Sequence, residues 1–245
     1  MRIPRIYTPS ALKTNSTVCL DINASVHVRD VLRLKINSQV ILFNGNGNDY
    51  VGKIVNQTKK KLEVVIDIAQ QVNNESSLQI QLLQPLCRAE KMDWCIQKAT
   101  ELGVQKITPV ICKHNNVKLA DNRIEKKLLH WQSVIHSACE QSGRATIPAI
   151  DTPQSLENAL ASMPKENSLR IISSPGAKKN ANELSAKTNH CICLVGPEGG
   201  FSEDELSLAN RYNFEFISLG PRILRLETAV VTTLSLVQSN WGDLN

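Results

Sequence analysis

Residues 191–205 read CICLVGPEGGFSEDE, and this stretch decides the fold. Its first five residues are a short apolar run of the kind found in buried strands. The glycines that follow form a tight turn, in which the backbone can approach another group closely. Ser202 and Glu205 then make a capping box, which begins a helix. The stretch therefore predicts a strand, a glycine-rich turn and a helix in direct succession.

Apolar runs and helical patterns alternate on both sides of this stretch. Strand-like runs are found at residues 78–86, 107–112, 169–173, 191–195 and 214–219. Helical spacing is found at 90–102, at 124–138 with Asp121 as a candidate cap and Gly143 as a stop, and at 228–239. This alternation predicts a layered α/β domain with a mostly parallel sheet. Because ligands of such sheets bind beyond the carboxyl ends of the strands, the loops after residues 173, 195 and 219 are the expected site.

Residues 1–72 have a different pattern, that of short strands. Val40–Phe43 runs into two Asn-Gly pairs and then into Tyr50–Val55, which is typical of a hairpin. Apolar residues alternate with acidic ones further along the same region. These features predict a small antiparallel sheet or barrel. The polar stretch 70–77 predicts a linker, so we expect domains at 1–72 and 78–245.

The charge of the chain is unevenly placed. The net charge is +5, and residues 1–72 hold ten basic against five acidic side chains, whereas the rest of the chain is balanced. A segregated basic region indicates attraction to a polyanion, nucleic acid above all, although solvated surface lysines are the plainer explanation. Aromatic residues make up only 4% of the chain, which excludes an array of stacking platforms for single-stranded nucleic acid.

The seven cysteines predict neither disulfides nor a metal site. None forms a Cys-x-x-Cys pair, and Cys191 and Cys193 fall on one face of a strand, which favours core packing over zinc. The opening residues lack the apolar core of a signal peptide, and no apolar run is long enough to cross a membrane. We therefore expect a cytoplasmic protein with no metal and no membrane partner.

Two glycine-containing loops are the candidates for chemistry. The first, around Glu198, is neither a dinucleotide fingerprint nor a P-loop, and the carboxylate would repel phosphates. It therefore favours a small phosphate-free cofactor, with a ligand-free turn as the alternative. The second loop places Arg222, Arg225 and Glu227 beside a very apolar helix, so these charges either pair internally or serve a site. Thr228 is a plausible N-cap of that helix, whose apolar circumference could be covered by this chain or by another subunit.

These motifs together resemble the bacterial small-subunit (16S) ribosomal RNA uridine-N3 methyltransferase family, the RsmE family of the SPOUT superfamily. The similar segments are residues 1–7, His27, 31–33, 90–104, 138–144, 195–202, 219–225 and 227–229. One departure is Leu226, where the family commonly has threonine. The ordered set spans nearly the whole chain, and it is far more specific than the Gly-Pro-Glu-Gly-Gly sequence alone.

The resemblance implies a trefoil-knotted SPOUT methyltransferase domain that binds S-adenosyl-L-methionine, preceded by a PUA-like β-barrel for RNA. It further implies a homodimer acting on 16S ribosomal RNA of the small ribosomal subunit. The implied cofactor-binding residues are Pro175, Leu194, Gly196, Gly199, Gly200, Leu219, Gly220, Leu224 and Thr228. The implied RNA-binding residues are Arg2, Arg5, His27, Arg33 and Arg144, although Arg144 by itself reads as a helix-end group.

For catalysis, Arg225 is the first candidate to stabilise the uracil anion, because its guanidinium is a fixed cation and a strong donor. Glu198 or Glu227 would orient Arg225 or take the N3 proton, and both roles stay open for both residues. Two other classes of function are compatible with the residues alone. One is an RNA-binding or ribosome-assembly module with a vestigial pocket, and the other is a different small-molecule enzyme that uses the same loops.

Overall fold

A computed structural model describes the chain except for residues 1–2, 60, 116–122, 165–166, 186–187 and 245. The chain divides into two compact units, which are described separately. The first comprises residues 1–75 and 136–147, and the second comprises 76–135 and 148–245. The division falls inside the expected linker, and residues 136–147 join the first unit although they lie far along the chain.

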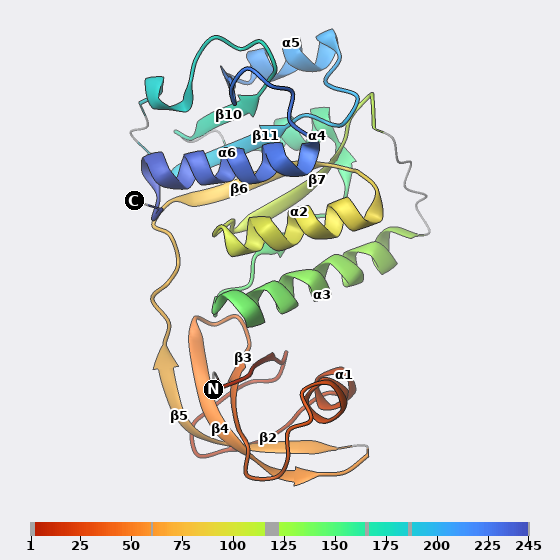
Figure 1. The fold of residues 1–245 in the computed structure, drawn as a ribbon, viewed down its shortest axis with the longest axis vertical. Coiled ribbons are helices and arrows are strands. Elements are labelled where there is room, and N and C mark those ends of the chain that lie inside the picture. The colour runs from red at the N-terminus through yellow and green to blue at the C-terminus, as the bar shows by residue number, and fades with distance from the viewer. Residues whose placement is uncertain (1–2, 60, 116–122, 165–166, 186–187, 245) are drawn as a thin grey trace. The chain divides into compact units, whose positions relative to one another are not determined.

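The first unit is built on a five-stranded sheet (Figure 1). Its strands are β1 (Arg5–Tyr7), β2 (Thr17–Cys19), β3 (Gln39–Phe43), β4 (Asn48–Gln57) and β5 (Leu62–Gln71). They lie in the order β1-β3-β4-β5-β2. All neighbours are antiparallel except β1 and β3, which are parallel. The expected antiparallel sheet is thus confirmed for four of the five strands.

The turn between β3 and β4 follows from its two Asn-Gly pairs. Gly45 and Gly47 have φ of 91° and 83°, a left-handed backbone that favours glycine. The hairpin prediction is therefore confirmed. The expected linker begins too early, however, because Gln70 and Gln71 still pair with β4 at the end of β5. β4 begins at Asn48, and its partner strand β5 continues to Gln71, the residue that pairs with Asn48.

A short helix and an irregular turn complete the first unit. Helix α1 (Ile22–Val26) is capped by Asp21, whose side chain accepts a hydrogen bond from the amide of Ala24. It continues as a π-helical turn, η1 (His27–Val31). The core beneath is aliphatic and includes Ile6, Val28, Val40, Leu42, Ile54, Leu62, Val64 and Ile66.

The second unit contains the predicted parallel sheet. Its strands are β6 (Gln79–Pro85), β7 (Lys106–Ile111), β8 (Ala149–Ile150), β9 (Gln154–Ser155), β10 (Leu169–Ser173), β11 (His190–Val195) and β12 (Glu215–Ile217). Their order is β12-β10-β11-β6-β7-β8, with β9 also on β7, and the neighbouring pairs are parallel. The five strand-like runs in the sequence all form strands within two residues of the expected ends.

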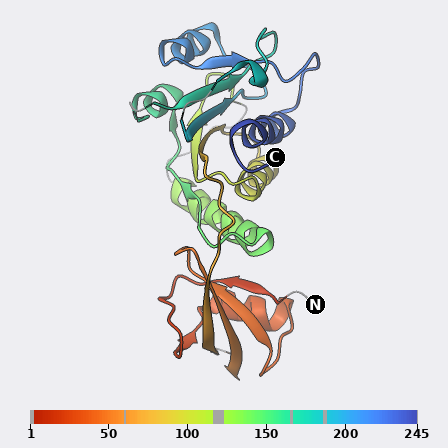
Figure 2. The same cartoon turned by 90° about the vertical axis from the view of Figure 1, so that its left-hand side faces the viewer.

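Helices cover both faces of this sheet (Figure 2). Helices α2 (Ala89–Glu101) and α6 (Leu226–Trp241) lie on one face, and α4 (Leu156–Ala161) and α5 (Glu203–Arg211) lie on the other. A short 3-10 helix, η3 (Ala181–Glu183), contacts α6. The layered α/β fold is thus confirmed. The capping box of α5 forms as expected, since Ser202 Oγ accepts from the amide of Glu205 and Glu205 Oε2 accepts from the amide of Ser202.

Helix α3 (Ile124–Ser142) begins in the second unit and ends in the first. Trp131, Ile135 and Ala138 of its predicted apolar stripe are buried. Gly143 follows the last residue with φ of 90°, so it ends the helix as expected. Asp121, the candidate cap, lies outside the described residues.

The start of α6 differs from the prediction. The N-cap is Arg225 rather than Thr228, and it makes no capping hydrogen bond through its side chain. Leu226 is 4% exposed, and its burial places the first turn against the core. Thr228 is therefore an exposed residue inside the first turn. Packing of an apolar residue, rather than a polar cap, decides where this helix begins.

Candidate functional site

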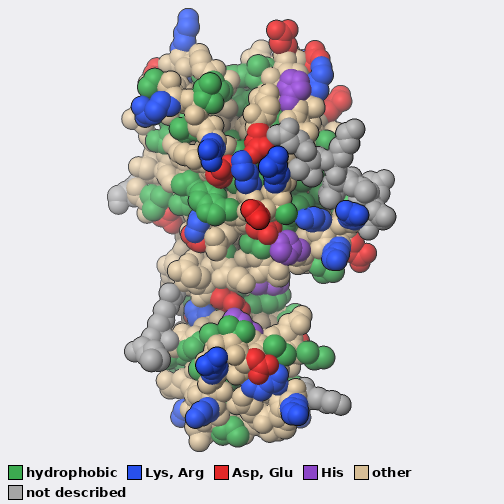
Figure 3. All heavy atoms as spheres, turned by 45° about the vertical axis from the view of Figure 1, so that its right-hand side comes forward, with side chains coloured by type: hydrophobic (Ala, Val, Ile, Leu, Met, Phe, Trp, Pro, Cys, Tyr) green, Lys and Arg blue, Asp and Glu red, His purple; other side chains and the backbone are tan. Residues whose placement is uncertain are grey.

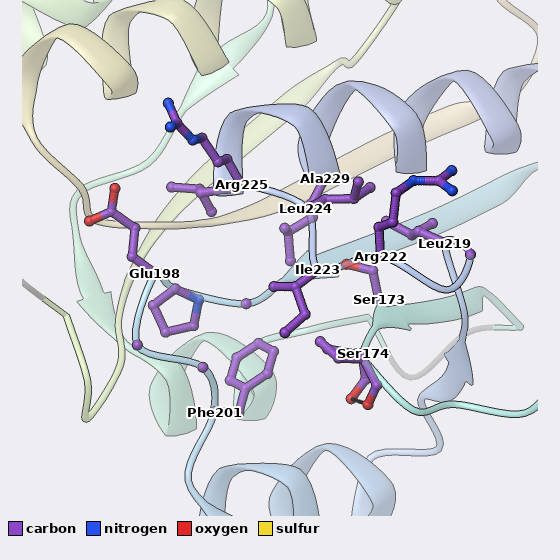
Figure 4. A pocket seen from close by; sticks show the side chains of 18 of the residues that line it. Ser173, Ser174, Glu198, Phe201, Leu219, Arg222, Ile223, Leu224, Arg225 and Ala229 are labelled. Carbon is purple, nitrogen blue, oxygen red and sulfur yellow. Dashed lines mark hydrogen bonds between the residues drawn. The ribbon is translucent and has the colours of Figure 1, made fainter.

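A cavity of about 650 Å³ opens at the carboxyl ends of three neighbouring strands of the second unit (Figure 4). Its walls come from the loops that follow β10, β11 and β12, together with the start of α6 and one residue each of α2 and α5. The lining residues are Lys91, 173–175, 195–201, Leu206, 219–220, 222–226 and Ala229. These three loops are the ones that the strand pattern singles out, so their convergence is confirmed.

Most of the expected cofactor residues lie on this wall. They are Pro175, Gly196, Gly199, Gly200, Leu219, Gly220 and Leu224. Two lie elsewhere. Leu194 is fully buried within β11, one residue before the wall begins, and Thr228 is exposed outside it. Leu226 is on the wall, and the structure gives it an apolar contact surface where a threonine would carry a hydroxyl.

The glycine-rich loop is held against the loop that follows β7. A Cβ on Gly199 would lie 2.8 Å from His114 Cβ and 3.0 Å from His114 O, so only glycine fits there without a shift. His114 Nδ1 lies 3.2 Å from Gly200 O, and the amide of Lys113 donates to Glu205 Oε1 at 2.7 Å. These contacts hold the glycine backbone at the cavity wall, where its polar groups can meet a ligand.

A lysine missed by the sequence analysis lies between the two candidate carboxylates. Lys91 of α2 lines the cavity, and its Nζ forms an ion pair with Glu198. The same Nζ lies 3.5 Å from Glu227 Oε2. The hydrogen bond to Glu198 raises the pKa of Lys91 above its ordinary value. Lys91 lies shortly after β6 in the chain, and β6 pairs with β11, which precedes the glycine loop. Placing β6 beside β11 is therefore the step that would have predicted Lys91 at the cavity.

Arg225 is placed differently from the two carboxylates. Within the described residues its side chain makes no hydrogen bond and no ion pair, and it is exposed at the cavity rim. Figure 4 shows the Arg225 guanidinium and the Glu198 carboxylate at the same end of the cavity. The guanidinium of Arg222 points the opposite way. Arg225 is thus a cation available to an anion that enters the cavity.

The basic residues expected to bind RNA separate into buried and exposed groups. Arg5 has a side chain only 4% exposed, and it pairs with Asp49 at 2.6 Å while donating to the carbonyls of Cys139 and Arg144. These bonds attach residues 136–147 to the first unit. Burial therefore corrects the expected role of Arg5, which lies inside the fold and not on a surface that could meet phosphate.

The remaining candidates are distributed as follows. Arg144 is also 4% exposed at its side chain and pairs with Glu75 at 2.6 Å, so burial corrects its expected role in the same way. Arg33 is exposed and has φ of 52°, which is uncommon for a residue other than glycine. His27 is half-buried at the start of η1. Arg2 lies outside the described residues.

A half-buried titratable pair lies next to Tyr7 in the first unit. The ring of His136 stacks on Tyr7 with centroids 3.6 Å apart, and the amide of Tyr7 donates to Glu140 Oε1 at 3.0 Å. Burial lowers the pKa of His136 to about 4, and burial raises the pKa of Glu140. The imidazole is therefore neutral in the folded chain over a range where it is charged in the unfolded chain.

The stability of the first unit should depend on pH through His136. Between pH 6.5 and pH 4 the unfolded chain binds a proton that the folded chain does not, so stability falls as the pH falls through this range. His136→Phe keeps a ring beside Tyr7 but removes the titrating group. Between pH 7 and pH 5 we expect its free energy of unfolding to fall by about 1 kcal/mol less than that of wild type, with allowance for solvent around the ring. Urea unfolding at both values measures this, and parallel pH profiles would contradict it. Glu140 is present in both proteins, so its opposite effect cancels.

Two family profiles match the chain in succession. The profile described as an RNA methyltransferase PUA domain matches residues 24–67, and the one described as an RNA methyltransferase domain matches 74–238. The second includes every residue that lines the cavity. Two proteins named ribosomal RNA small subunit methyltransferase E match over nearly full length. The Buchnera aphidicola (strain Sg) protein is 37% identical, covering 100% of this chain and 99% of its own, and the Rickettsia conorii protein is 33% identical, covering 97% and 96%.

The chain belongs to the ribosomal RNA small subunit methyltransferase E family. Two solved structures resemble this family member over 100% of both chains. A Legionella pneumophila methyltransferase in complex with the cofactor SAM has a TM-score of 0.96 at 37% identity. A Neisseria gonorrhoeae ribosomal RNA small subunit methyltransferase E bound to S-adenosyl methionine has a TM-score of 0.92 at 35% identity. The resemblance seen in the sequence motifs is thereby confirmed.

No described helix has the length and apolar character needed to span a membrane. No group of three or more His, Cys, Asp or Glu side chains that could hold a metal ion occurs among the described residues.

Proposed function

We propose that this protein transfers the methyl group of S-adenosyl-L-methionine to N3 of a uridine in the 16S ribosomal RNA of the small ribosomal subunit. Its family membership supports methylation of small-subunit ribosomal RNA, and two of its structural relatives were solved with this cofactor bound. The observation that carries the proposal is the cavity at the ends of β10, β11 and β12, built entirely from the methyltransferase segment.

The residues of the cavity fit this cofactor. A volume of about 650 Å³ is in the range of small-molecule sites. Phe201, Leu219 and Leu224 offer apolar surface for a nucleoside ring, and the glycine loop offers backbone groups at close range. Arg222 can meet a carboxylate, and Glu198 can meet an ammonium group. The cavity has no phosphate-binding loop, as a phosphate-free cofactor requires.

The reaction needs a deprotonated uracil held in line with the methyl group. When bound, S-adenosyl-L-methionine supplies an electrophilic methyl on a sulfonium, and the sulfur keeps the electron pair as the new N–CH₃ bond forms. Arg225 at the cavity rim stabilises the negative charge that develops on the uracil when N3 loses its proton. Glu198 or Glu227 accepts that proton directly or through water. Holding the two reactants in place lowers the entropic part of the barrier.

We further propose that exposed cations of the first unit contact the RNA. Arg33 is exposed beside the η1 turn, and Figure 3 shows Lys and Arg side chains on the visible face of that unit. Such contacts position RNA through its phosphates. Because the substrate is ribosomal and all seven cysteines are free, we place this activity in the cytoplasm.

A homodimer is part of the proposal. Val231 and Leu236 of the apolar helix α6 are only half-buried in the single chain, which supports a second copy as their cover. Sedimentation equilibrium should give twice the mass of one chain at micromolar concentration. A monomeric mass at every protein concentration at which the enzyme is active would reject the dimer. The trefoil knot stays a prediction from the resemblance.

Transfer of label tests the function. The protein is incubated with tritiated S-adenosyl-L-methionine and small subunits from cells that lack the enzyme, and the modified RNA is mapped by mass spectrometry. We expect one labelled uridine, methylated at N3. Cofactor binding without any label on RNA would favour the RNA-binding module with a vestigial pocket, or a different acceptor. Label at another atom would reject the N3 assignment alone.

Gly199→Ala should weaken cofactor binding. The added methyl would meet His114 at 2.8 Å, and the glycine loop must shift to relieve this contact. We expect the dissociation constant of S-adenosyl-L-methionine to rise about tenfold in calorimetry, since misplaced backbone donors cost roughly 1.4 kcal/mol. Ser207→Ala is the control, because Ser207 is exposed on α5 and lies outside the cavity wall. Equal affinity for Gly199→Ala and wild type would show that the loop does not contact the cofactor.

A further inference from the structure

Lys91 brings together two parts of the cavity that are far apart in the sequence. Its ammonium group forms an ion pair with Glu198 of the glycine loop, and it lies 3.5 Å from Glu227 in the first turn of α6. The three side chains are between 21% and 32% exposed, so solvent only partly screens their charges. Glu227 Oε2 is itself buried and makes no hydrogen bond. Lys91 is thus the cation placed against that oxygen.

The two carboxylates also lie near Arg225, Glu227 in the sequence and Glu198 in the cavity. Glu227 follows Arg225 by two residues on the helix that Arg225 caps, and Glu198 lies at the same end of the cavity in Figure 4. Even so, no ion pair joins either carboxylate to Arg225 in the part of the chain that the structure describes. Both carboxylates lie within ion-pair distance of Lys91. The Arg225 guanidinium lies at the rim, and it makes no hydrogen bond or ion pair with the described residues.

We propose that Lys91 is a positioning residue, which holds Glu198 and Glu227 so that Arg225 stays available to the RNA base. This role rests on the proposed function, in which Arg225 faces the developing uracil anion. An arginine already paired with a carboxylate would have to break that pair before it could bind the anion, and much of its stabilising effect would be lost. Lys91 prevents that pairing by offering both carboxylates a closer cation.

Loss of Lys91 should transfer a carboxylate to Arg225. Lys91→Met keeps most of the aliphatic stem and removes the charge, which leaves Glu198 and Glu227 without their shared cation. Two like charges left together repel each other, and Arg225 at the same end of the cavity becomes an accessible partner for Glu198. A second change, Glu198→Gln, removes the competing charge and should release Arg225 again. Lys91→Arg keeps the cation and should preserve the arrangement.

The first test measures how accessible the Arg225 side chain is to a chemical reagent, in the absence of RNA. Phenylglyoxal reacts with accessible arginine side chains, and mass spectrometry gives the labelling rate of Arg225 relative to Arg222. Arg222 serves as an internal reference because it lies in the same loop and points the other way. We expect the ratio to fall about tenfold in Lys91→Met and to recover in the Lys91→Met, Glu198→Gln double variant, as coupled charges in contact should behave. An unchanged ratio in Lys91→Met would overturn the proposal.

The second test reads catalysis. We expect Lys91→Met to lower kcat for RNA methylation about tenfold with little change in the KM of S-adenosyl-L-methionine, and Lys91→Arg to stay near wild type. Recovery in Lys91→Arg together with loss in Lys91→Met is a result that depends on the charge and not on the packing of the side chain. An unchanged kcat in Lys91→Met, or equal losses in Lys91→Met and Lys91→Arg, would overturn the proposal. If wild type methylates no RNA, the proposed function fails, while the phenylglyoxal ratio still decides the role of Lys91.

Discussion

Replacing Arg225 by alanine is expected to lower the rate of RNA methylation at least ~100-fold, the loss typical of one transition-state donor. The guanidinium lies at the cavity rim and has no partner among the described side chains, so the fold does not depend on it. We therefore expect an unchanged circular dichroism spectrum and an unchanged affinity for S-adenosyl-L-methionine. Single-turnover kinetics with pre-bound RNA isolates the chemical step from RNA binding.

Arg222→Ala is the matched control for this experiment. Arg222 belongs to the same loop and lines the same cavity, but its guanidinium points away from Glu198 and Arg225. Its removal should change the single-turnover rate less than about tenfold, because it does not face the reacting base. A near-normal rate for Arg225→Ala, or equal losses for both variants, would remove Arg225 from the catalytic role.

Replacing Arg5 by methionine is expected to destabilise the first unit by about 3–5 kcal/mol, the cost of breaking a buried ion pair. The side chain is 4% exposed, and methionine would leave Asp49 without its cation. The carbonyls of Cys139 and Arg144, which lie far from Arg5 in the sequence, would also lose their hydrogen bonds from the guanidinium. Methionine keeps much of the volume, so the loss reports on charge and hydrogen bonding rather than on a cavity.

Hydrogen exchange is the suitable measurement, because it resolves the first unit from the second. Peptides from β3, β4 and β5 should exchange much faster in Arg5→Met, whereas those from β6 and β11 should not change. Lys13→Met is the control, since Lys13 is an exposed cation of the same unit and its loss should contribute little. Exchange in Arg5→Met at the wild-type rate would return Arg5 to the candidates for RNA contact.

Much of the fold could be predicted because its signals are local. The apolar runs of β10 and β11, the capping box of α5 and the Gly143 stop of α3 each depend on residues close in the sequence. The same holds for the site loops, because parallel strands place their carboxyl ends at one edge of the sheet. The start of α6 was missed because burial of Leu226, a tertiary contact, outweighs the polar cap expected at Thr228.

The misassigned residues share a different cause. Arg5 and Arg144 belong to this group, since a charge count cannot tell an arginine in water from a buried arginine that pairs with a half-buried carboxylate. Lys91 was overlooked because it lies on a helix rather than on a glycine loop. Its place at the cavity depends on β6 lying next to β11, and these strands are separated by more than a hundred residues.

The sequence alone determined the family, the α/β layering of the second unit and the three loops that form the cavity. These follow from periodicity, turn chemistry and ordered motifs, which are properties of neighbouring residues. Only the tertiary structure decided which charges are available. In the folded chain Arg5 and Arg144 are buried, and Lys91 forms ion pairs with Glu198 and Glu227. Arg225 lies at the rim of the cavity. The physical reason is that the energy of a charge depends on its burial and on its nearest opposite charge, and folding sets both.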